Sequence, residues 1–365
     1  MHILIMAGGT GGHIFPALAV AKKLLEQGHV VHWLGTSKGM EVEIATNNNI
    51  EIHRISIAGI RGKSLASKLL APIRLTGALL QSLLVMLSFK PDVVLGMGGY
   101  VTGPAGIAAW LTRRRLVIHE QNAIAGMTNQ ILAKFSSKVL EAFPNSFPQT
   151  MATQLTGNPV REDFYKLIAP EKRSTKNSSS ALKLLILGGS GGARALNNIM
   201  PQILSTWGGT QKLMLWHQAG AKHVDDAKQA YLSAGLNVEV NSLVNTSNIK
   251  LVDFIQDMPN AYAWADIVIC RAGALTIAEL AVAGVASILI PFPFAVDDHQ
   301  TKNAQYLAQA GAAILVPEHE VTVLKLQSLL QDLAADPRKL LAMAKAAHKL
   351  AKPDALAKVV EFCLA

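Results

Sequence analysis

The chain has 365 residues, of which 50% are hydrophobic, 5% aromatic and 16% charged. This length is too great for one ordinary core and fits two domains of about 150–200 residues each. The largely aliphatic composition excludes disorder as the main state and favours helices and parallel strands over an aromatic-rich sandwich. Only two cysteines are present, Cys270 and Cys363. They exclude a disulfide scaffold and indicate buried thiols in a reducing compartment.

The formal net charge of +9 is unevenly distributed along the chain. Residues 1–160 carry 14 basic and 7 acidic side chains, whereas residues 161–365 carry 20 and 18. A basic half of this kind attracts nucleic acid, an anionic membrane or a phosphorylated substrate. The sequence has no basic run interleaved with aromatics and no zinc or RNA-reading motif. Nucleic acid is therefore not expected as a partner.

The first residues, Met1–Met6, have no basic segment and run into glycines, so they predict a strand rather than a signal peptide. The longest uncharged apolar run, Leu75–Phe89, has 15 residues, fewer than the ~20 that span a bilayer. We therefore expect no membrane-spanning segment in this sequence.

A short aliphatic strand, a glycine-rich turn and a helical pattern occur in this order twice. The first set is residues 3–6 followed by the turn Gly8–His13, and the second is residues 184–187 followed by the turn Gly188–Ala193. This order begins a doubly wound nucleotide-binding sheet. Further strands are predicted at residues 30–34, 93–95, 115–119 and 139–142 in the first half, and at 213–217, 267–270, 286–290 and 313–316 in the second.

Helical stretches alternate with these strands, so both sheets should be parallel. The sequence therefore predicts an α/β fold of two Rossmann-like domains, each with a doubly wound parallel sheet. The turn-rich segment Gly157–Arg161 is the expected boundary between them.

In the first half, polar side chains follow several predicted strands. His13 lies between the glycine-rich turn and its helix, where a neutral imidazole can take a proton from a substrate hydroxyl. A helix-capping or packing histidine is the open alternative. The turn is neither a Walker A loop nor a dinucleotide fingerprint. Tyr100, Glu120 and Asn122 are expected at the same sheet edge as His13.

In the second half, three segments suit a sugar nucleotide. Ser190 and the amides after it can hold a diphosphate at a helix N-terminus. Glu279 can accept hydrogen bonds from ribose hydroxyls, and Gln300 suits neutral sugar hydroxyls. The open alternatives are a tight turn without a ligand at Ser190 and a solvated helix charge at Glu279. The adjacent pair Asp297 and Asp298 is interpreted as a helix cap, so no metal site is expected.

Residues 63–90 combine Lys63, Lys68 and Arg74 with an uncharged aliphatic helix. A helix that is apolar on most sides is usually a core helix. The alternative is an interfacial patch that enters the bilayer surface between basic side chains. The basic first half favours this second interpretation, with Ile73, Leu79, Leu80 and Leu83 as the membrane patch.

Seven motifs resemble, in order, those of the MurG family of bacterial N-acetylglucosaminyltransferases: GGTGGH, GMGGY, HEQN, GNPVR, GGSGGARALN, CRAGALTIAE and DDHQTKNA. The resemblance runs from Met1 to about Ala310. It implies a GT-B fold, in which two Rossmann-like domains face each other across a cleft. Residues 1–160 would form the acceptor and membrane-facing domain, to which a C-terminal helix at 348–365 returns. Residues 161–347 would form the donor domain.

The implied reaction is inverting transfer of N-acetylglucosamine (GlcNAc) from UDP-GlcNAc to the C4 hydroxyl of N-acetylmuramic acid (MurNAc) in lipid I, giving lipid II and UDP. No metal or other cofactor is implied. His13 would be the general base, with Glu120 as the second candidate, and Tyr100 and Asn197 would position the acceptor. The residues implied to contact UDP-GlcNAc are Thr10, Gly11, Gly12, Asn122, Arg161, Ser190, Ile255, Ala274, Leu275, Thr276, Ile277, Ala278, Glu279 and Gln300.

The resemblance also implies a peripheral location on the cytoplasmic face of the bacterial inner membrane. The implied partners are UDP-GlcNAc, lipid I, the anionic membrane surface, and other proteins of cell-wall synthesis and cell division. Two alternatives stay open: a UDP-GlcNAc epimerase of the same fold, and a lipid-binding scaffold without catalytic activity. The apolar, basic-flanked helix speaks against the epimerase, which needs no lipid acceptor.

Overall fold

A computed structural model describes residues 1–57, 70–173, 181–189, 192–209, 211–241 and 248–365. The chain divides into two compact units. Unit 1 contains Met1–Arg161 together with Lys352–Ala365, and unit 2 contains Glu162–Ala351. The segment that returns to unit 1 begins later than the expected residue 348, because helix α14 (Pro337–Lys349) stays in unit 2.

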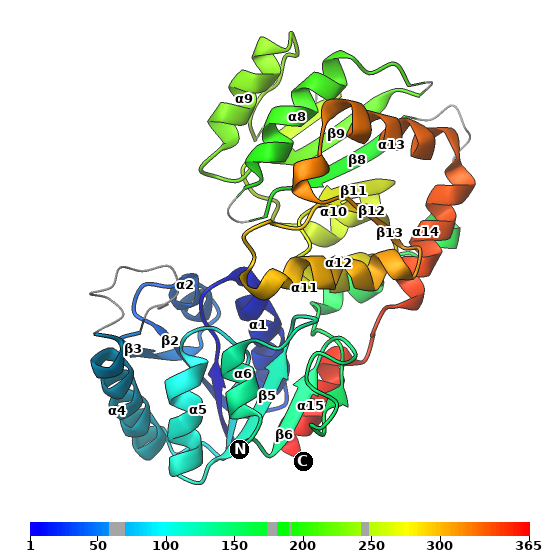
Figure 1. Ribbon diagram of the computed structural model, residues 1–365. Helices are drawn as coiled ribbons and strands as arrows, with labels where there is room; N and C mark the ends of the chain where they lie inside the picture. The colour runs from blue at the N-terminus through cyan, green and yellow to red at the C-terminus, as the bar shows by residue number, and fades with distance from the viewer. Residues whose placement is uncertain (58–69, 174–180, 190–191, 210, 242–247) are drawn as a thin grey trace. The chain divides into compact units, whose positions relative to one another are not determined.

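Unit 1 is built on a parallel sheet with the strand order β3-β2-β1-β4-β5-β6-β7 (Figure 1). The order reverses between β1 and β4, and ligands of such sheets bind at the carboxyl ends of the strands near this reversal. Its strands are β1 (His2–Met6), β2 (Val30–Thr36), β3 (Glu51–Ile55), β4 (Val93–Gly96), β5 (Arg115–Glu120), β6 (Lys138–Glu141) and β7 (Gln154–Leu155).

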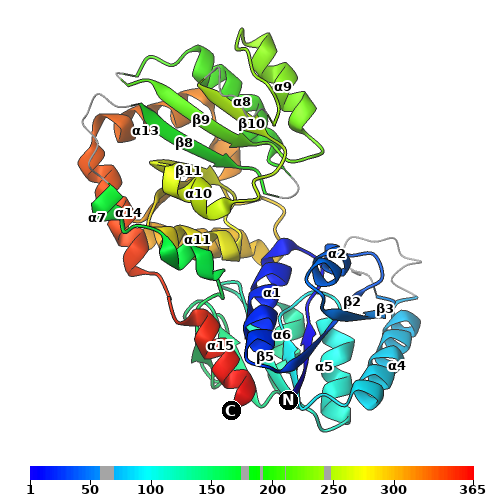
Figure 2. The same cartoon turned by 180° about the vertical axis from the view of Figure 1, so that it is seen from behind.

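Helices cover both faces of this sheet. One face packs on α1 and α15, which lie side by side in Figure 2, and the other packs on α4, α5 and α6. Trp33 is fully buried beneath the first pair, and its indole Nε1 donates a hydrogen bond to the Ala7 carbonyl at 2.8 Å. The helices are α1 (Gly11–Glu26), α2 (Met40–Asn47), α4 (Ala71–Phe89), α5 (Thr102–Leu111), α6 (Met127–Leu132) and α15 (Ala355–Leu364).

Unit 2 repeats the arrangement with a parallel sheet in the order β10-β9-β8-β11-β12-β13. Its strands are β8 (Leu182–Leu187), β9 (Leu213–Gln218), β10 (Ile249–Val252), β11 (Ile267–Cys270), β12 (Ala286–Leu289) and β13 (Ala313–Leu315). Its helices are α7 (Pro170–Arg173), α8 (Arg194–Ser205), α9 (Val224–Ser233), α10 (Met258–Trp264), α11 (Ala274–Ala283), α12 (His299–Gln309), α13 (Val323–Ala335) and α14. The predicted fold class, two doubly wound α/β units, is confirmed.

Three strands were missed by the sequence analysis: β3, β7 and β10. β3 reads EIHRI, in which charged and histidine side chains interrupt the aliphatic pattern. β3 and β10 are edge strands with one paired neighbour each. An edge strand needs fewer buried apolar side chains than a central parallel strand, so its sequence signal is weaker.

Candidate active site

Two glycine-rich loops pack against each other at the carboxyl edge of the unit 1 sheet. The amide of Gly8, in the first turn, donates to the Gly98 carbonyl at 3.3 Å. A Cβ on Gly99 would lie 2.1 Å from the Gly8 carbonyl oxygen, and a Cβ on Gly98 would lie 2.6 Å from His13 Nδ1. Both glycines also have positive φ angles, +98° for Gly98 and +90° for Gly99. Glycine is therefore required here because the backbone touches the other loop and the His13 ring.

His13 is the first member of a chain of hydrogen bonds. Its Nδ1 lies 2.8 Å from Oε1 of Gln121. Nε2 of Gln121 lies 3.1 Å from Nδ1 of His119, and Nε2 of His119 lies 3.0 Å from the Gly157 carbonyl oxygen. All four residues belong to unit 1. This series of hydrogen bonds therefore runs from a backbone acceptor, through two buried side chains, to the half-buried His13.

The direction of these hydrogen bonds follows from their two ends. The Gly157 carbonyl can only accept, so His119 donates from Nε2 and accepts at Nδ1. Burial lowers the pKa of His119 to about 4, although its bond to Gly157 partly opposes this effect, so the ring is neutral near pH 7. Gln121 then donates to His119 with its NH₂ group and accepts from His13 with its oxygen. His13 consequently carries its proton on Nδ1, which leaves the lone pair of Nε2 available to accept a proton.

Glu120 lies beside this network, but both of its oxygens are already hydrogen-bonded. Oε1 accepts from the backbone and side-chain nitrogens of Asn122 at 2.9 and 3.1 Å. Oε2 accepts from the Gly126 amide at 3.1 Å and from Asn129 Nδ2 at 2.8 Å. The side chain is buried. This arrangement holds the loop after β5 in place.

The other expected residues of unit 1 lie at the same strand ends or close by. Thr10 is exposed at the N-cap of α1, and Gly11 and Gly12 form the first turn of that helix. Tyr100 is 57% exposed at the loop before α5. Arg161 is the last residue of the first segment of unit 1. Thr10, Gly11 and Gly12 thus adjoin His13 in the sequence, and the exposed Tyr100 follows the Gly98–Gly99 turn that contacts the His13 ring.

In unit 2, the second glycine-rich turn also packs against a neighbouring loop. Gly192 has a φ of +72°, and a Cβ there would lie 2.7 Å from the Ala219 carbonyl oxygen. A Cβ on Gly220 would lie 2.9 Å from the Gly192 backbone. Ser190, the expected diphosphate contact, lies outside the residues that the structure describes.

Helix α11 begins at the carboxyl end of β11, with Gly273 as its N-cap. Ala274, Leu275 and Thr276 form its first turn, where the backbone N–H groups and the helix dipole favour an anion. Ile277 and Ala278 follow, and Glu279 accepts a hydrogen bond from the hydroxyl of fully buried Tyr262 at 3.2 Å. Tyr262 thereby fixes the orientation of the carboxylate that was expected to bind ribose.

The loop after β12 is held by Arg271, which the sequence analysis did not single out. Its Nη1 donates to the carbonyls of Ile290 and Pro291, each at 3.2 Å, and its guanidinium forms an ion pair with Glu318. Gln300, at the start of α12, accepts from the Phe292 amide at 2.9 Å, which orients its NH₂ group. The available signal for Arg271 was its place directly after a buried strand. Ile255 is buried in the loop between β10 and α10.

Asn197 differs from the expectation of an acceptor contact. It is only 3% exposed, its Nδ2 donates to the Ala219 carbonyl at 3.1 Å, and its Oδ1 lies 3.0 Å from His217 Nε2. These bonds tie α8 to the end of β9. A buried amide with both ends hydrogen-bonded holds the fold together, and we do not place Asn197 in the acceptor site.

The membrane patch also needs correction. Ile73 and Leu80 are 70% and 57% exposed, but Leu79 and Leu83 are only partly exposed because they pack on the core of unit 1. The exposed apolar side chains of α4 also include Leu84 and Leu87, at 67% and 58%. Ile73 and Leu80 of the expected patch therefore lie on the exposed side of α4, whereas Leu79 and Leu83 do not. We use the name α4 stripe for Ile73, Leu80, Leu84 and Leu87. Lys63 and Lys68 lie outside the described residues.

By length and composition alone, the 19-residue α4 could cross a membrane, although the uncharged run within it has only 15 residues. Its opposite side is nevertheless packed within unit 1, since Ala78, Ser82 and Met86 are fully buried. Figure 1 shows α4 lying along α5 on one face of the sheet. One-sided burial of this kind is the packing of an amphipathic surface helix.

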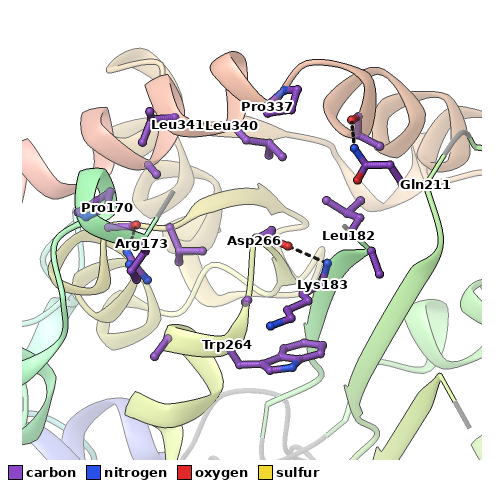
Figure 3. A pocket seen from close by; sticks show the side chains of 17 residues that line it. Pro170, Arg173, Leu182, Lys183, Gln211, Trp264, Asp266, Pro337, Leu340 and Leu341 are labelled. Atoms are coloured by element: carbon purple, nitrogen blue, oxygen red, sulfur yellow. Dashed lines mark hydrogen bonds between the residues drawn. The ribbon is translucent and has the colours of Figure 1, made fainter. Parts of the chain in front are cut away.

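A hollow of about 230 Å³ lies at the other end of unit 2, near the amino ends of β8, β11 and β12 (Figure 3). Trp264, Lys183 and Arg173 line it together with residues of α14. The Lys183 amide donates to Asp266 Oδ2 at 2.9 Å, so a hydrogen bond already joins the amino ends of β8 and β11 here. This hollow is at the edge of the sheet opposite to the glycine-rich turn, and it contains none of the predicted site residues.

Comparison with known proteins identifies the family. The N-terminal domain of glycosyltransferase family 28 matches residues 3–141, and its C-terminal domain matches residues 183–359. A UDP-N-acetylglucosamine–N-acetylmuramyl-(pentapeptide) pyrophosphoryl-undecaprenol N-acetylglucosamine transferase from Marinobacter nauticus is 51% identical over 361 residues, which are 99% of this chain and 96% of that protein.

Two solved structures extend the comparison. The crystal structure of MurG from Acinetobacter baumannii has a TM-score of 0.82 and 39% identity, covering 100% of this chain and 99% of that one. A UDP-GlcNAc 2-epimerase from Neisseria meningitidis has a TM-score of 0.63 at 14% identity, with full coverage of both chains, and shows a shared fold alone. The resemblance inferred from the seven motifs is thus confirmed along the whole chain. The chain belongs to the MurG family of N-acetylglucosamine transferases, within glycosyltransferase family 28.

Proposed function

We propose that this protein transfers GlcNAc from UDP-GlcNAc to the MurNAc residue of undecaprenyl-pyrophosphoryl-MurNAc-pentapeptide, lipid I. The observation that carries the proposal is the 51% identity to a transferase of this name over 99% of the chain. The likeness to the epimerase rests on 14% identity and supports only the fold. Transfer is therefore the function that we assign, in preference to epimerisation.

His13 is the general base in this proposal. As the C4 oxygen of MurNAc bonds to C1 of GlcNAc, the bond from C1 to the diphosphate oxygen breaks and its electron pair leaves with UDP. The hydroxyl proton passes to Nε2 of His13, the nitrogen that the bond from Nδ1 to Gln121 leaves as an acceptor. Attack on the face opposite to the departing UDP inverts the configuration at C1.

Glu120 has a different task. Four hydrogen-bond donors already contact its two oxygens, so accepting a proton would break bonds that hold the loop after β5. We assign Glu120 to positioning Asn122 and the adjacent backbone.

Unit 2 would bind the donor. The first turn of α11 offers backbone N–H groups and the positive end of its dipole to the diphosphate, where negative charge grows as UDP leaves. Glu279, oriented by Tyr262, accepts from the ribose hydroxyls, and Gln300 contacts the sugar. These interactions supply charge stabilisation without a metal ion, so we propose that the reaction needs none.

The test is product analysis with the purified full-length protein, UDP-GlcNAc and a short-chain lipid I analogue. We expect equimolar UDP and a β-1,4-linked disaccharide product, at a rate unchanged by a chelator. UDP-GlcNAc alone should give no epimer. Formation of an epimer without acceptor would overturn the proposal in favour of an isomerase, and absence of any turnover would favour a scaffold.

We also propose that the protein is peripheral to the cytoplasmic face of the inner membrane, bound through the α4 stripe. Trp110, Met127 and Ile131 on α5 and α6 are also about half exposed, and extend the apolar surface on this side of unit 1. Basic side chains of unit 1, in excess over its acidic ones, would attract anionic headgroups. Other proteins of cell-wall synthesis and division are a predicted class of partner for this location.

Flotation with anionic liposomes tests this surface. Replacing Leu80 and Leu84 by Ser should weaken binding about tenfold or more, because two exposed leucines no longer enter the lipid. The matched control is Leu324→Ser, which changes an 82% exposed leucine in unit 2 and should leave binding unchanged. Equal binding by the α4 variant and the wild type would contradict the proposed surface.

A further inference from the structure

Two histidines and a glutamate gather on the edge of the unit 1 sheet, outside the proposed active site. His32 lies on β2, and Glu51 and His53 lie on the edge strand β3. The parallel register pairs His32 with Glu51 and Leu34 with His53, so the three side chains project from the same face. This is the face that α4 covers, whereas His13 begins α1 on the opposite face.

The three side chains are within reach of a single ion. His32 Nδ1 lies 2.9 Å from His53 Nε2. Glu51 Oε2 lies 3.4 Å from the other ring nitrogen of His32, Nε2, so the carboxylate would have to turn to join an ion bound at Nδ1. One potential ligand atom from each of the three residues lies within 4.8 Å of the other two. The imidazoles are partly buried, whereas the Glu51 side chain is 67% exposed, which leaves it room to turn.

Phe89, near the end of α4, packs against these imidazoles. Its ring stacks on His32 with ring centroids 3.9 Å apart and lies 5.9 Å from the ring of His53, and it also stacks on His2 at 5.3 Å. This packing restricts the orientations of the His32 ring.

We propose that His32, His53 and Glu51 form a binding site for a divalent transition-metal ion of the Zn²⁺ type. Two imidazole nitrogens and one carboxylate oxygen match the ligands of such ions, whereas Mg²⁺ and Ca²⁺ take oxygen ligands. Two Zn–N bonds of about 2.05 Å at a tetrahedral angle place the nitrogens about 3.3 Å apart. The pair at 2.9 Å needs to open by only about 0.4 Å. Water completes the fourth position at this partly exposed edge.

The bound ion would join β3 to β2 by side chains as well as by backbone hydrogen bonds. The edge strand β3 has one paired neighbour in the sheet, so an added link stabilises it. The metal site takes no part in the transfer reaction, so its existence does not depend on the proposed function.

The experiment is isothermal titration of the full-length, chelator-treated protein with ZnCl₂, together with the visible spectrum after addition of Co²⁺. The wild type should bind one equivalent and give the spectrum of four-coordinate cobalt. His53→Gln should weaken binding by about 100-fold or more, and Glu51→Gln, which changes an exposed side chain, by about tenfold. His319→Gln, at an 82% exposed histidine of unit 2, is the matched control and should bind like the wild type.

Circular dichroism checks that each variant is folded, and the exposed position of Glu51 keeps the test informative if a histidine variant unfolds. Absence of zinc binding by the folded wild type would overturn the proposal. Binding that survives both His53→Gln and Glu51→Gln would also overturn it, because the ion would then lie elsewhere.

Discussion

Each unit contains a buried histidine network next to its glycine-rich turn, and the two networks differ at one end. In unit 2, His217 joins Asn197 and Tyr231, and all three side chains are nearly or fully buried. In unit 1, His119 joins Gln121, and the network continues to the half-buried His13.

The difference separates polar groups with a structural role from the half-buried ring that we propose as the general base. Burial lowers the pKa of His217 to about 3 and that of His119 to about 4, so neither ring exchanges protons near pH 7. Only the unit 1 network presents an accepting nitrogen at its outer end. The same kind of strand end thus supports a closed network that stabilises the fold or an open one that can move a proton.

The largest expected effect concerns His13, at the half-buried end of the unit 1 network. His13→Gln should lower kcat by about 100-fold or more, because it removes the proton acceptor. His29→Gln, at a partly exposed histidine of the same unit, is the control and should keep full activity. A steady-state transfer assay measures both. If folded His13→Gln kept most of its activity while Glu120→Gln lost it, the roles assigned to these two residues would be exchanged.

The next effect concerns the two buried rings and depends on pH. In the unfolded chain each histidine has a pKa of about 6.5. In the folded units burial lowers the pKa to about 4 for His119 and to about 3 for His217. Stability supplied by the neutral rings is therefore full above pH 6.5 and falls as the pH decreases toward these values. Lowering the pH from 7 to 5 should therefore reduce the free energy of unfolding by on the order of 2 kcal/mol for each ring.

Urea unfolding at several pH values measures this loss. His217→Gln removes one titrating group, so its free energy of unfolding should be lower at pH 7 but less dependent on pH than that of the wild type. A pH dependence identical to that of the wild type would show that His217 is not the buried neutral ring described here.

A smaller effect tests the contact between Gly98 and His13. Gly98→Ala places a Cβ 2.6 Å from His13 Nδ1 at a φ of +98°, so the ring must move away from Gln121. We expect a loss of about 1–3 kcal/mol in stability together with reduced transfer activity. Gly77→Ala is the matched control: it lies in α4 with open space around its Cα, and it should stabilise the protein slightly. Normal activity of folded Gly98→Ala would separate this contact from catalysis.

The smallest effect tests the link through Gln121. Gln121→Leu should reduce kcat by about tenfold, since His13 keeps its ring but loses the group that holds Nδ1 protonated. Gln121→Glu should move the acidic limb of the pH–rate profile to higher pH, because a carboxylate beside the ring favours its protonated form. A profile unchanged in both variants would limit Gln121 to a packing role.

Much of the fold was predictable, because buried parallel strands are short aliphatic runs followed by glycine-rich turns. His13, Tyr100, Glu120 and Asn122 each follow a central strand, so their place at the carboxyl edge of the unit 1 sheet was predictable. The role of Gln121 was not predictable, although the residue lies within the HEQN motif. It depends on the direction of a series of hydrogen bonds that begins at the carbonyl of Gly157. Leu79 and Leu83 were wrongly included in the expected patch, because a uniformly apolar helix gives no sequence signal for which side is buried.

The sequence by itself determined two parallel α/β units and the glycine-rich turns at the carboxyl ends of their strands, since local apolar runs and turns specify both. Tertiary structure decided which polar side chains are available for chemistry. Asn197 and His13 both lie within the first four residues of helices that follow glycine-rich turns. Packing against β9 nevertheless buries Asn197, while the contacts of His13 leave a ring nitrogen as an acceptor. Burial and hydrogen-bond direction arise from residues far apart in the chain, and no local pattern encodes them.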